Sequence, residues 1–310
     1  MSESERASPR EAWAVGEESG GSGSFHTSTL HDERLSSASL ETLWQAWTAP
    51  AARRLWAVLT GEATVLDERD VGGPRNAVRQ PEGEEELRCT HTWLSLRPAS
   101  FSVSAATETV GGRFLSASLI TATFSSDQTT SRVRLTVQRS AACGETDEGA
   151  ASRLAAGLDA LVDVAARTML IERVIPASRE RVWSAWMNET RLPTWWGPDG
   201  FTCRTTRIDL RPGGEWVFDM IGPDGTVFPN HHLYHEIIPH ERFAYSLLWG
   251  ENGPKHADAW ASFEPTEGGT LVRLGMVFSS VAEFQTAEGF GAPALGHQTL
   301  GKLERALLQP

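Results

Sequence analysis

The sequence has few of the features that mark secreted, membrane-spanning or disulfide-bonded proteins. Its 310 residues include only three cysteines, Cys89, Cys143 and Cys203, which are isolated and form no Cys-x-x-Cys pair. Isolated cysteines favour a reducing compartment over a disulfide framework. No apolar run approaches the roughly 18 residues of a membrane helix, and the N-terminal stretch lacks the apolar core of a signal peptide. We therefore expect a soluble, cytoplasmic protein without a membrane span.

Positive charge is also scarce. The chain carries 28 Lys and Arg residues against 40 Asp and Glu residues, a net charge of -12 at neutral pH. This excess repels phosphate backbones, and no basic stripe offsets it. The composition therefore argues against a nucleic-acid partner.

Recognisable catalytic motifs are missing as well. The sequence holds no Gly-x-Ser-x-Gly elbow, no His-Glu-x-x-His and no glycine-rich phosphate loop. We assign no catalytic residue and predict no cofactor. An enzyme is not excluded, because a fold can accelerate a reaction by shaping a reactive chain without a sequence motif.

Four histidines lie within ten residues of one another, namely His231, His232, His235 and His240. On a strand, His231 and His235 share one face while His232 takes the other, so three of them do not converge on one ion. We predict no metal site. His232, together with Tyr234 and His297, is a candidate polar contact for a ligand.

What the chain does contain is an internal repeat. The segment from Glu33 to Trp56 aligns without gaps with Glu172 to Trp195, 139 residues later, and nine of the 24 aligned residues are identical. Average residue usage would give roughly one or two identities. Farther on, residues 132–135 precede residues 271–274 by the same offset, and the apolar residues Val133 and Leu135 align with Val272 and Leu274. We therefore predict two copies of one domain.

Composition and periodicity set the domain boundaries. Residues 1–24 are rich in Ser, Glu and Gly and are predicted to be a disordered tail. Residues 150–166 have apolar side chains at helical spacing and are predicted to close the first domain, 25–166. The second domain, 168–310, follows with almost no linker.

The second copy is predicted to be α+β. A strand at 169–174 precedes a helix at 179–187, capped by Ser178, and a second short helix ends at Gly197-Pro198. Period-two patterns then predict antiparallel strands at 215–220, 232–238, 242–249, 257–263 and 270–278. Ser280 and Glu283 form a capping box that opens a C-terminal helical region, which is interrupted at Pro293.

These residues resemble a known family. Arg173, Ala177, Val182-Trp183 and Ala185-Trp186, then Trp195-Trp196-Gly197-Pro198, Asp209-Leu210-Arg211-Pro212-Gly213-Gly214 and His297-Gln298-Thr299-Leu300, occur in the order seen in the START-like superfamily known as SRPBCC. They are most similar to its branch named after the C-terminal domain of the heat-shock-protein-90 ATPase activator homologues. The first copy is degraded: it keeps Trp44, Ala46, Trp47, Trp56 and Gly72-Gly73, and it lacks the Trp-Trp-Gly-Pro element.

The resemblance implies a helix-grip fold, in which a curved antiparallel sheet wraps a long C-terminal helix and leaves a cavity. Members of the superfamily hold lipids, polyketides or other apolar small molecules there, sometimes with cyclase or aromatase chemistry, and one branch docks on a chaperone. We predict binding of a small hydrophobic molecule, lipid-like or aromatic, in the second copy, with the first copy structural or regulatory. A protein partner, as for a chaperone cofactor, and a cyclase-like enzyme are the alternatives.

Inward-facing positions and the family motifs give the residues expected to line the cavity. They are Trp195, Trp196, Trp216, Phe218, Met220, His232, Tyr234, Tyr245, Trp249, Met276, Phe284 and His297. An aromatic, Met-rich wall with a few polar groups suits a small apolar ligand. The same side chains could instead fill a closed core. A further hypothesis is that the two short helices form a lid over the cavity, hinged at Gly197-Pro198-Asp199-Gly200.

Overall fold

The structure is a computed structural model that describes residues 25–49, 51–52, 55, 74–79, 87–97, 100–109, 114–127, 129–142 and 147–308. The predicted tail, Trp56 and Gly72-Gly73 lie outside these residues. The described residues form two compact units, the first ending at Val162 and the second beginning at Asp163, and the short stretch 45–55 groups with the second. Each unit is described by itself.

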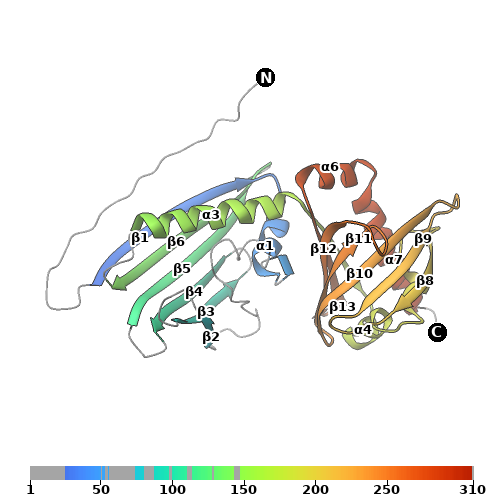
Figure 1. Cartoon of the computed structure of the whole chain (residues 1–310), viewed down its shortest axis with the longest axis horizontal. Coiled ribbons are helices and arrows are strands. Elements are labelled where there is room, and N and C mark those ends of the chain that lie inside the picture. The colour runs from blue at the N-terminus through green and yellow to red at the C-terminus, as the bar shows by residue number, and fades with distance from the viewer. Residues whose placement is uncertain are drawn as a thin grey trace, which may run out of the picture. The chain divides into compact units, whose positions relative to one another are not determined.

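The first unit is built on a six-stranded antiparallel sheet with the order β1-β6-β5-β4-β3-β2 (Figure 1). A long helix, α3, lies along this sheet, and Arg34 of β1 donates from Nε to Asp159 Oδ1 of that helix (2.5 Å). The predicted closing helix is thus confirmed. The elements are β1 (Phe25–Ser36), α1 (Leu40–Thr48), β2 (Pro74–Arg79), β3 (Leu87–Arg97), β4 (Ser100–Thr109), β5 (Phe114–Ser126), β6 (Ser131–Ala142) and α3 (Asp147–Ala166).

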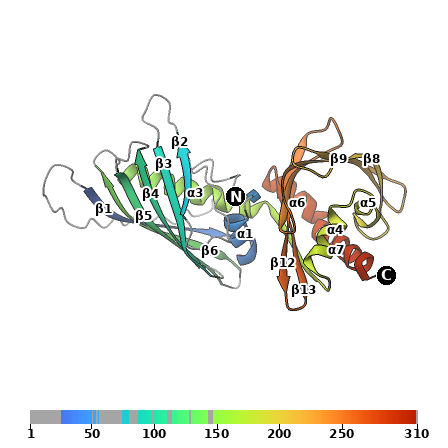
Figure 2. The same ribbon diagram turned by 90° about the horizontal axis from the view of Figure 1, so that it is seen from below.

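The second unit repeats this plan with a seven-stranded antiparallel sheet, in the order β7-β13-β12-β11-β10-β9-β8. Its sheet curls around the helices α5 and α7 (Figure 2). The elements are β7 (Thr168–Ile175), α4 (Arg179–Trp186), α5 (Leu192–Trp195), β8 (Thr202–Ile208), β9 (Glu215–Ile221), β10 (Val227–Ile238), β11 (Arg242–Leu248), β12 (Lys255–Thr266), β13 (Gly269–Phe278), α6 (Val281–Gly289) and α7 (Ala292–Leu308).

Local signals explain where the helices of the second unit begin and end. Ser178 Oγ accepts the backbone N–H of Arg181 at the start of α4, and Ser280 Oγ accepts that of Glu283 at the start of α6. Each serine satisfies an N–H group that has no partner within its helix. The break between α6 and α7 falls at Gly291, whose φ of 85° is unfavourable for residues with a side chain. The predicted caps are confirmed. The interruption predicted at Pro293 falls two residues earlier, and Pro293 itself stands in the first turn of α7.

Both sheets have the same edge, because the first strand of each unit pairs with the last. β1 pairs antiparallel with β6, and β7 pairs with β13. One ion pair recurs at this junction with the 139-residue offset of the repeat: Glu33 with Arg134 (2.8 Å), and Glu172 with Arg273 (2.6 Å). The repeat seen in the sequence therefore extends to side-chain contacts.

The inward face also follows the repeat. Val133 and Leu135 of β6 are buried, as are Val272 and Leu274 of β13. A shift of one residue would turn these side chains to the opposite face, so both copies keep the same register. The predicted α+β helix-grip architecture in two tandem copies is confirmed.

Candidate functional site

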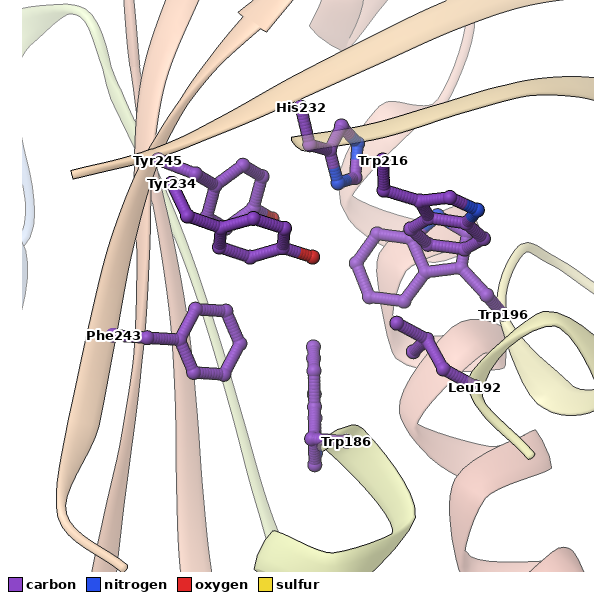
Figure 3. A pocket seen from close by; sticks show the side chains of 8 residues that line it. All are labelled: Trp186, Leu192, Trp196, Trp216, His232, Tyr234, Phe243 and Tyr245. Atoms are coloured by element: carbon purple, nitrogen blue, oxygen red, sulfur yellow. The ribbon is translucent and has the colours of Figure 1, made fainter. Parts of the chain in front are cut away.

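A cluster of eight side chains lies between the sheet and the short helices of the second unit (Figure 3). We call it the aromatic cluster, because seven of its eight members carry rings. Its members are Trp186, Leu192, Trp196, Trp216, His232, Tyr234, Phe243 and Tyr245.

The sheet supplies one wall of the cluster and the helices supply the other. Strand alternation turns Tyr234 of β10 and Tyr245 of β11 to the same face, and these two residues are direct partners in the register. His232 is likewise the partner of Trp216 on β9. Opposite them stand Trp186 at the end of α4, and Leu192 and Trp196 at the two ends of α5.

The rings pack closely. Trp216 stacks on Phe218 at a centroid distance of 3.8 Å, and His232 lies 4.6 Å from Tyr245. Trp196 contacts both Trp186 (5.3 Å) and Trp216 (6.0 Å) in edge-on geometry, an arrangement that aromatic rings favour. The eight side chains leave no room for a water molecule between them. The interior is therefore closed in this structure.

Two polar groups of the cluster are buried without a hydrogen-bond partner among the described residues, the hydroxyl of Tyr245 and Nε1 of Trp186. Tyr245 is only 2% exposed. Other indoles nearby are satisfied, since Trp195 Nε1 donates to Ala185 O and Trp216 Nε1 to Thr205 Oγ1, both at 3.0 Å. Most buried polar side-chain atoms in native proteins are paired, so these two need an explanation.

Burial also fixes the charge state of the cluster. It lowers the pKa of His232 to about 3, with a smaller effect from the neighbouring histidines, so the imidazole is neutral at physiological pH. Burial raises the pKa of Tyr245, and it raises the pKa of Tyr234 well above the usual value, so both phenols keep their protons. The cluster is therefore uncharged at neutral pH.

The segment that follows α5 is tied to α7. We call residues 196–201 the α5–β8 loop. The ammonium of Lys302 on α7 donates to the carbonyl oxygens of Trp196 (3.4 Å), Pro198 (3.3 Å) and Phe201 (2.9 Å). The Asp199 carboxylate in the loop accepts from Arg305, and the Asp199 backbone N–H donates to Gln298 Oε1 on α7. One helix thus holds the whole loop in place.

Ten of the twelve residues predicted to line a cavity lie in or against the packed interior. Trp196, Trp216, His232, Tyr234 and Tyr245 belong to the aromatic cluster. Trp195 and Phe218 are buried in the surrounding core, and Met220, Met276 and Phe284 are half-buried against it. The structure thus brings together most of the predicted set around a filled space, rather than around a preformed cavity.

Trp249 and His297 lie outside this interior. Alternation with Tyr245 predicts an inward Trp249, but the β11–β12 register shifts at Leu247/Leu248. The irregularity interrupts the alternation, and Trp249 is 52% exposed with its ring stacked on His256 (4.3 Å). His297 is exposed because it points away from the face of α7 that carries the buried Leu300, Leu303 and Leu307.

Leu192 and Lys302 were not singled out in the sequence. Leu192 is the first residue of α5 and lies between Trp186 and Trp195, two tryptophans of the family motifs. Its position between them is the only feature of the sequence that points to Leu192 as a member of the cluster. Lys302 was hidden because its partners are backbone carbonyls, which leave no trace in side-chain patterns.

The clustered histidines are engaged separately. His231 Nε2 lies 2.7 Å from Glu215 Oε2, and His235 Nε2 lies 2.8 Å from Ser246 Oγ. His232 faces the aromatic cluster instead. Within the described part of the chain, no three His, Cys, Asp or Glu side chains are grouped so that they could hold a metal ion, and no helix there is long and apolar enough to cross a bilayer.

Comparison with known families agrees with this architecture. The model of the family described as "Activator of Hsp90 ATPase homolog 1-like protein" matches the chain twice, at residues 37–166 and 176–307. The chain belongs to this family. The two matches correspond to the two sheet-and-helix units and confirm the resemblance noted in the sequence. No curated protein matches the chain.

Solved structures of similar proteins each align with about one copy. Protein NE0264 from Nitrosomonas europaea is 25% identical and covers 47% of this chain and 96% of its own length, with a TM-score of 0.43. Protein Ms6760 from Mycobacterium smegmatis is 21% identical and covers 47% and 93%, also with a TM-score of 0.43. A putative uncharacterized protein from Rhizobium leguminosarum is 26% identical and covers 45% and 95%, with a TM-score of 0.39.

Proposed function

We propose that the second unit binds a small, largely apolar molecule within the aromatic cluster, and that the first unit is a structural or regulatory partner. The observation that carries this proposal is the buried Tyr245 hydroxyl, which has no hydrogen-bond partner among the described residues. A buried hydroxyl without a partner costs about 1–3 kcal/mol of stability. A ligand that accepts a hydrogen bond from it would offset that cost.

Binding requires the cluster to open, because its side chains fill the space between them. The α5–β8 loop is the element suited to move. It carries Trp196, which is half-buried at the edge of the cluster, and its glycines Gly197 and Gly200 have φ values of 89° and 81°. Its tether to α7 consists of polar contacts, which can exchange with water. We therefore propose that this loop is a lid over the aromatic cluster and that Lys302 holds it closed.

Native mass spectrometry of the full chain, followed by solvent extraction, tests the binding proposal. We expect a co-purifying small molecule that is lost when Trp216→Ala removes a ring from the wall. Because Trp216→Ala also weakens the core, Tyr245→Phe serves as a milder second variant with a reduced bound fraction. A clean apo mass, with no thermal shift across a panel of lipids and aromatic compounds, would rule out the proposal.

Amide hydrogen exchange tests the lid. Lys302→Met keeps the apolar stem but removes the donors, so we expect faster exchange in residues 197–201 and faster association of any binding compound. Lys255→Met, at an exposed position on β12, is the matched control and should leave the loop unchanged. The lid is excluded if residues 188–201 of the unmodified protein exchange as slowly as the central strands with and without a bound compound.

A second candidate function is docking of a protein partner, as the name of the family suggests. It is favoured by three exposed apolar side chains, Val227, Phe228 and Trp249. The chain segments that carry them are adjacent, since Gly250 approaches the Pro229 side chain. Single exposed apolar side chains are common, whereas a group of them on one surface marks an interaction site. If this function holds, the full chain stimulates the ATPase of an Hsp90-type chaperone, Trp249→Ala abolishes the effect, and Phe290→Ala, at another exposed apolar site, does not.

A further inference from the structure

We infer that the molecule bound by the aromatic cluster is electrically neutral and carries a hydrogen-bond acceptor, such as the carbonyl oxygen of an aryl ketone, quinone or ester, and that fatty acids and other anions are rejected. This inference rests on the proposed function of the same site and specifies the class of ligand. It depends on three features of the cluster: its lining, its donors and the position of the nearby cations.

The lining contains no charged side chain. Its eight members are aromatic or apolar, and none is Lys, Arg, Asp or Glu. A carboxylate that entered this space would lose its hydration without gaining a cation, which is among the most costly events in a protein interior. The faces of the aromatic rings also carry the negative part of their quadrupole and therefore repel anions. Both effects favour a neutral ligand.

The polar groups of the lining are mainly donors. Tyr245 and Tyr234 keep their phenolic protons because burial raises the pKa of each. The indole Nε1 of Trp186 can only donate, and like the Tyr245 hydroxyl it has no partner among the described residues. A ligand that forms hydrogen bonds with these groups must offer an acceptor. A pure hydrocarbon would fill the space but leave both groups unpaired.

The cations beside the cluster already have hydrogen-bond or ion-pair partners. Lys302 directs its ammonium to three carbonyl oxygens of the α5–β8 loop, and an ammonium has three donors in total. Arg305 of the same helix binds Asp199. An incoming carboxylate would have to compete with these contacts, which also hold the loop. A neutral acceptor faces no such competition.

The shape of the cluster favours a flat molecule. Tyr234, Tyr245 and Phe243 form the wall on the sheet, and Leu192 and Trp196 stand across from them on α5 (Figure 3). When the loop moves away from the sheet, Trp196 separates from the sheet wall and opens a slot that is lined largely by rings. A planar aromatic ligand gains the most contact area in such a slot.

Three naphthalenes of nearly equal size test the inference on the full chain: 2-acetylnaphthalene as the neutral acceptor, 2-naphthoate as the anion and 2-isopropylnaphthalene as the hydrocarbon. Dissociation constants are measured at pH 7.5 by calorimetry and by tryptophan fluorescence. We expect the ketone to bind about tenfold more tightly than the hydrocarbon, the effect of one hydrogen bond. It should bind at least about 100-fold more tightly than the naphthoate.

Tyr245→Phe provides the matched variant. It should keep the affinity for 2-isopropylnaphthalene, which also shows that the site is intact, and lose the tenfold advantage of the ketone. Naphthoate binding as tight as ketone binding would overturn the inference while leaving the proposed function standing, as would equal affinities for the ketone and the hydrocarbon. If none of the three compounds binds to the unmodified protein or to Lys302→Met, the proposed function fails with it.

Discussion

The Tyr245 hydroxyl gives a prediction whose sign is unusual. Removing a buried hydroxyl normally destabilises a protein because its partner is left unsatisfied. Here no partner is found among the described residues, so Tyr245→Phe should raise the free energy of unfolding by about 1–3 kcal/mol, the desolvation cost of the unpaired group. Urea denaturation of the ligand-free protein measures this difference.

Thr270→Val is the matched control at a paired hydroxyl. Thr270 is 0% exposed, and its Oγ1 donates to Ala177 O over 2.8 Å. Loss of that bond leaves the Ala177 carbonyl without its partner, and we expect the free energy of unfolding to decrease by about 1–2 kcal/mol. If both variants lost stability to the same extent, the Tyr245 hydroxyl would have to be paired.

His232 makes stability depend on pH. Burial lowers its pKa from the usual 6.5 to about 3 in the folded protein. Between these values the unfolded chain binds a proton that the folded chain does not, so stability decreases as pH falls below about 6.5. A drop from pH 7 to pH 5 should lower the free energy of unfolding by about 2 kcal/mol. Burial also lowers the pKa of His256, which acts in the same direction.

The variant His232→Leu tests this dependence at similar side-chain volume. Urea unfolding at pH 7, 6 and 5 should show a clearly shallower loss of stability than in the unmodified protein. An unchanged slope would mean that the imidazole of His232 is not the group responsible.

Among the elements, the sheets were the most predictable part. Bulky apolar side chains recur at every second residue along β9, β11 and β13, and this period of two is typical of a strand. The caps at Ser178 and Ser280 were equally visible, because they depend on residues close in sequence. Trp249 could not be placed correctly, since a change of register within a strand pair depends on the neighbouring strand.

The closed state of the aromatic cluster could not be read from the sequence either. Period-two logic identifies side chains that face inward, but the distance between the two walls depends on how α4 and α5 dock. In the structure Trp186 and Trp196 reach the ring system of the sheet and close the space. A predicted cavity and a filled core share the same inward pattern, and tertiary packing decides between them.

Close packing of β12 against β13 gives a prediction at Gly275. This residue is the register partner of Trp260, and a Cβ added to it would lie 2.1–2.3 Å from atoms of the Trp260 ring. Gly275→Ala should therefore displace the indole and cost about 2–3 kcal/mol. Gly289→Ala at the end of α6 is the control, because nothing lies within 4 Å of its added Cβ. Thermal unfolding of both variants distinguishes a steric cause from a general effect of Gly→Ala.

At the scale of the whole molecule, each copy has its own sheet and its own closing helix. The second unit starts with local contacts just before β7: Arg167 pairs with Asp163 (2.9 Å), and Thr168 Oγ1 donates to Val164 O (2.6 Å). We expect a fragment of residues 163–310 to fold alone with a cooperative thermal transition. Its affinity for 2-acetylnaphthalene should match that of the full chain. A fragment that folds but does not bind would instead assign the first copy a part in the binding site.

The pairing of first and last strands has a consequence for folding during synthesis. β7 must wait for β13, roughly 100 residues later, which corresponds to about 5–20 s of translation. β1 and β7 begin two related copies and have similar sequences. β7 therefore competes with β1 for pairing with β6, and β1 competes with β7 for pairing with β13. The order of synthesis separates these events: β6 ends at Ala142, before β7 begins at Thr168. The ladder between β1 and β6 can therefore close before its competitor exists, which protects this tandem protein against strand exchange between its copies.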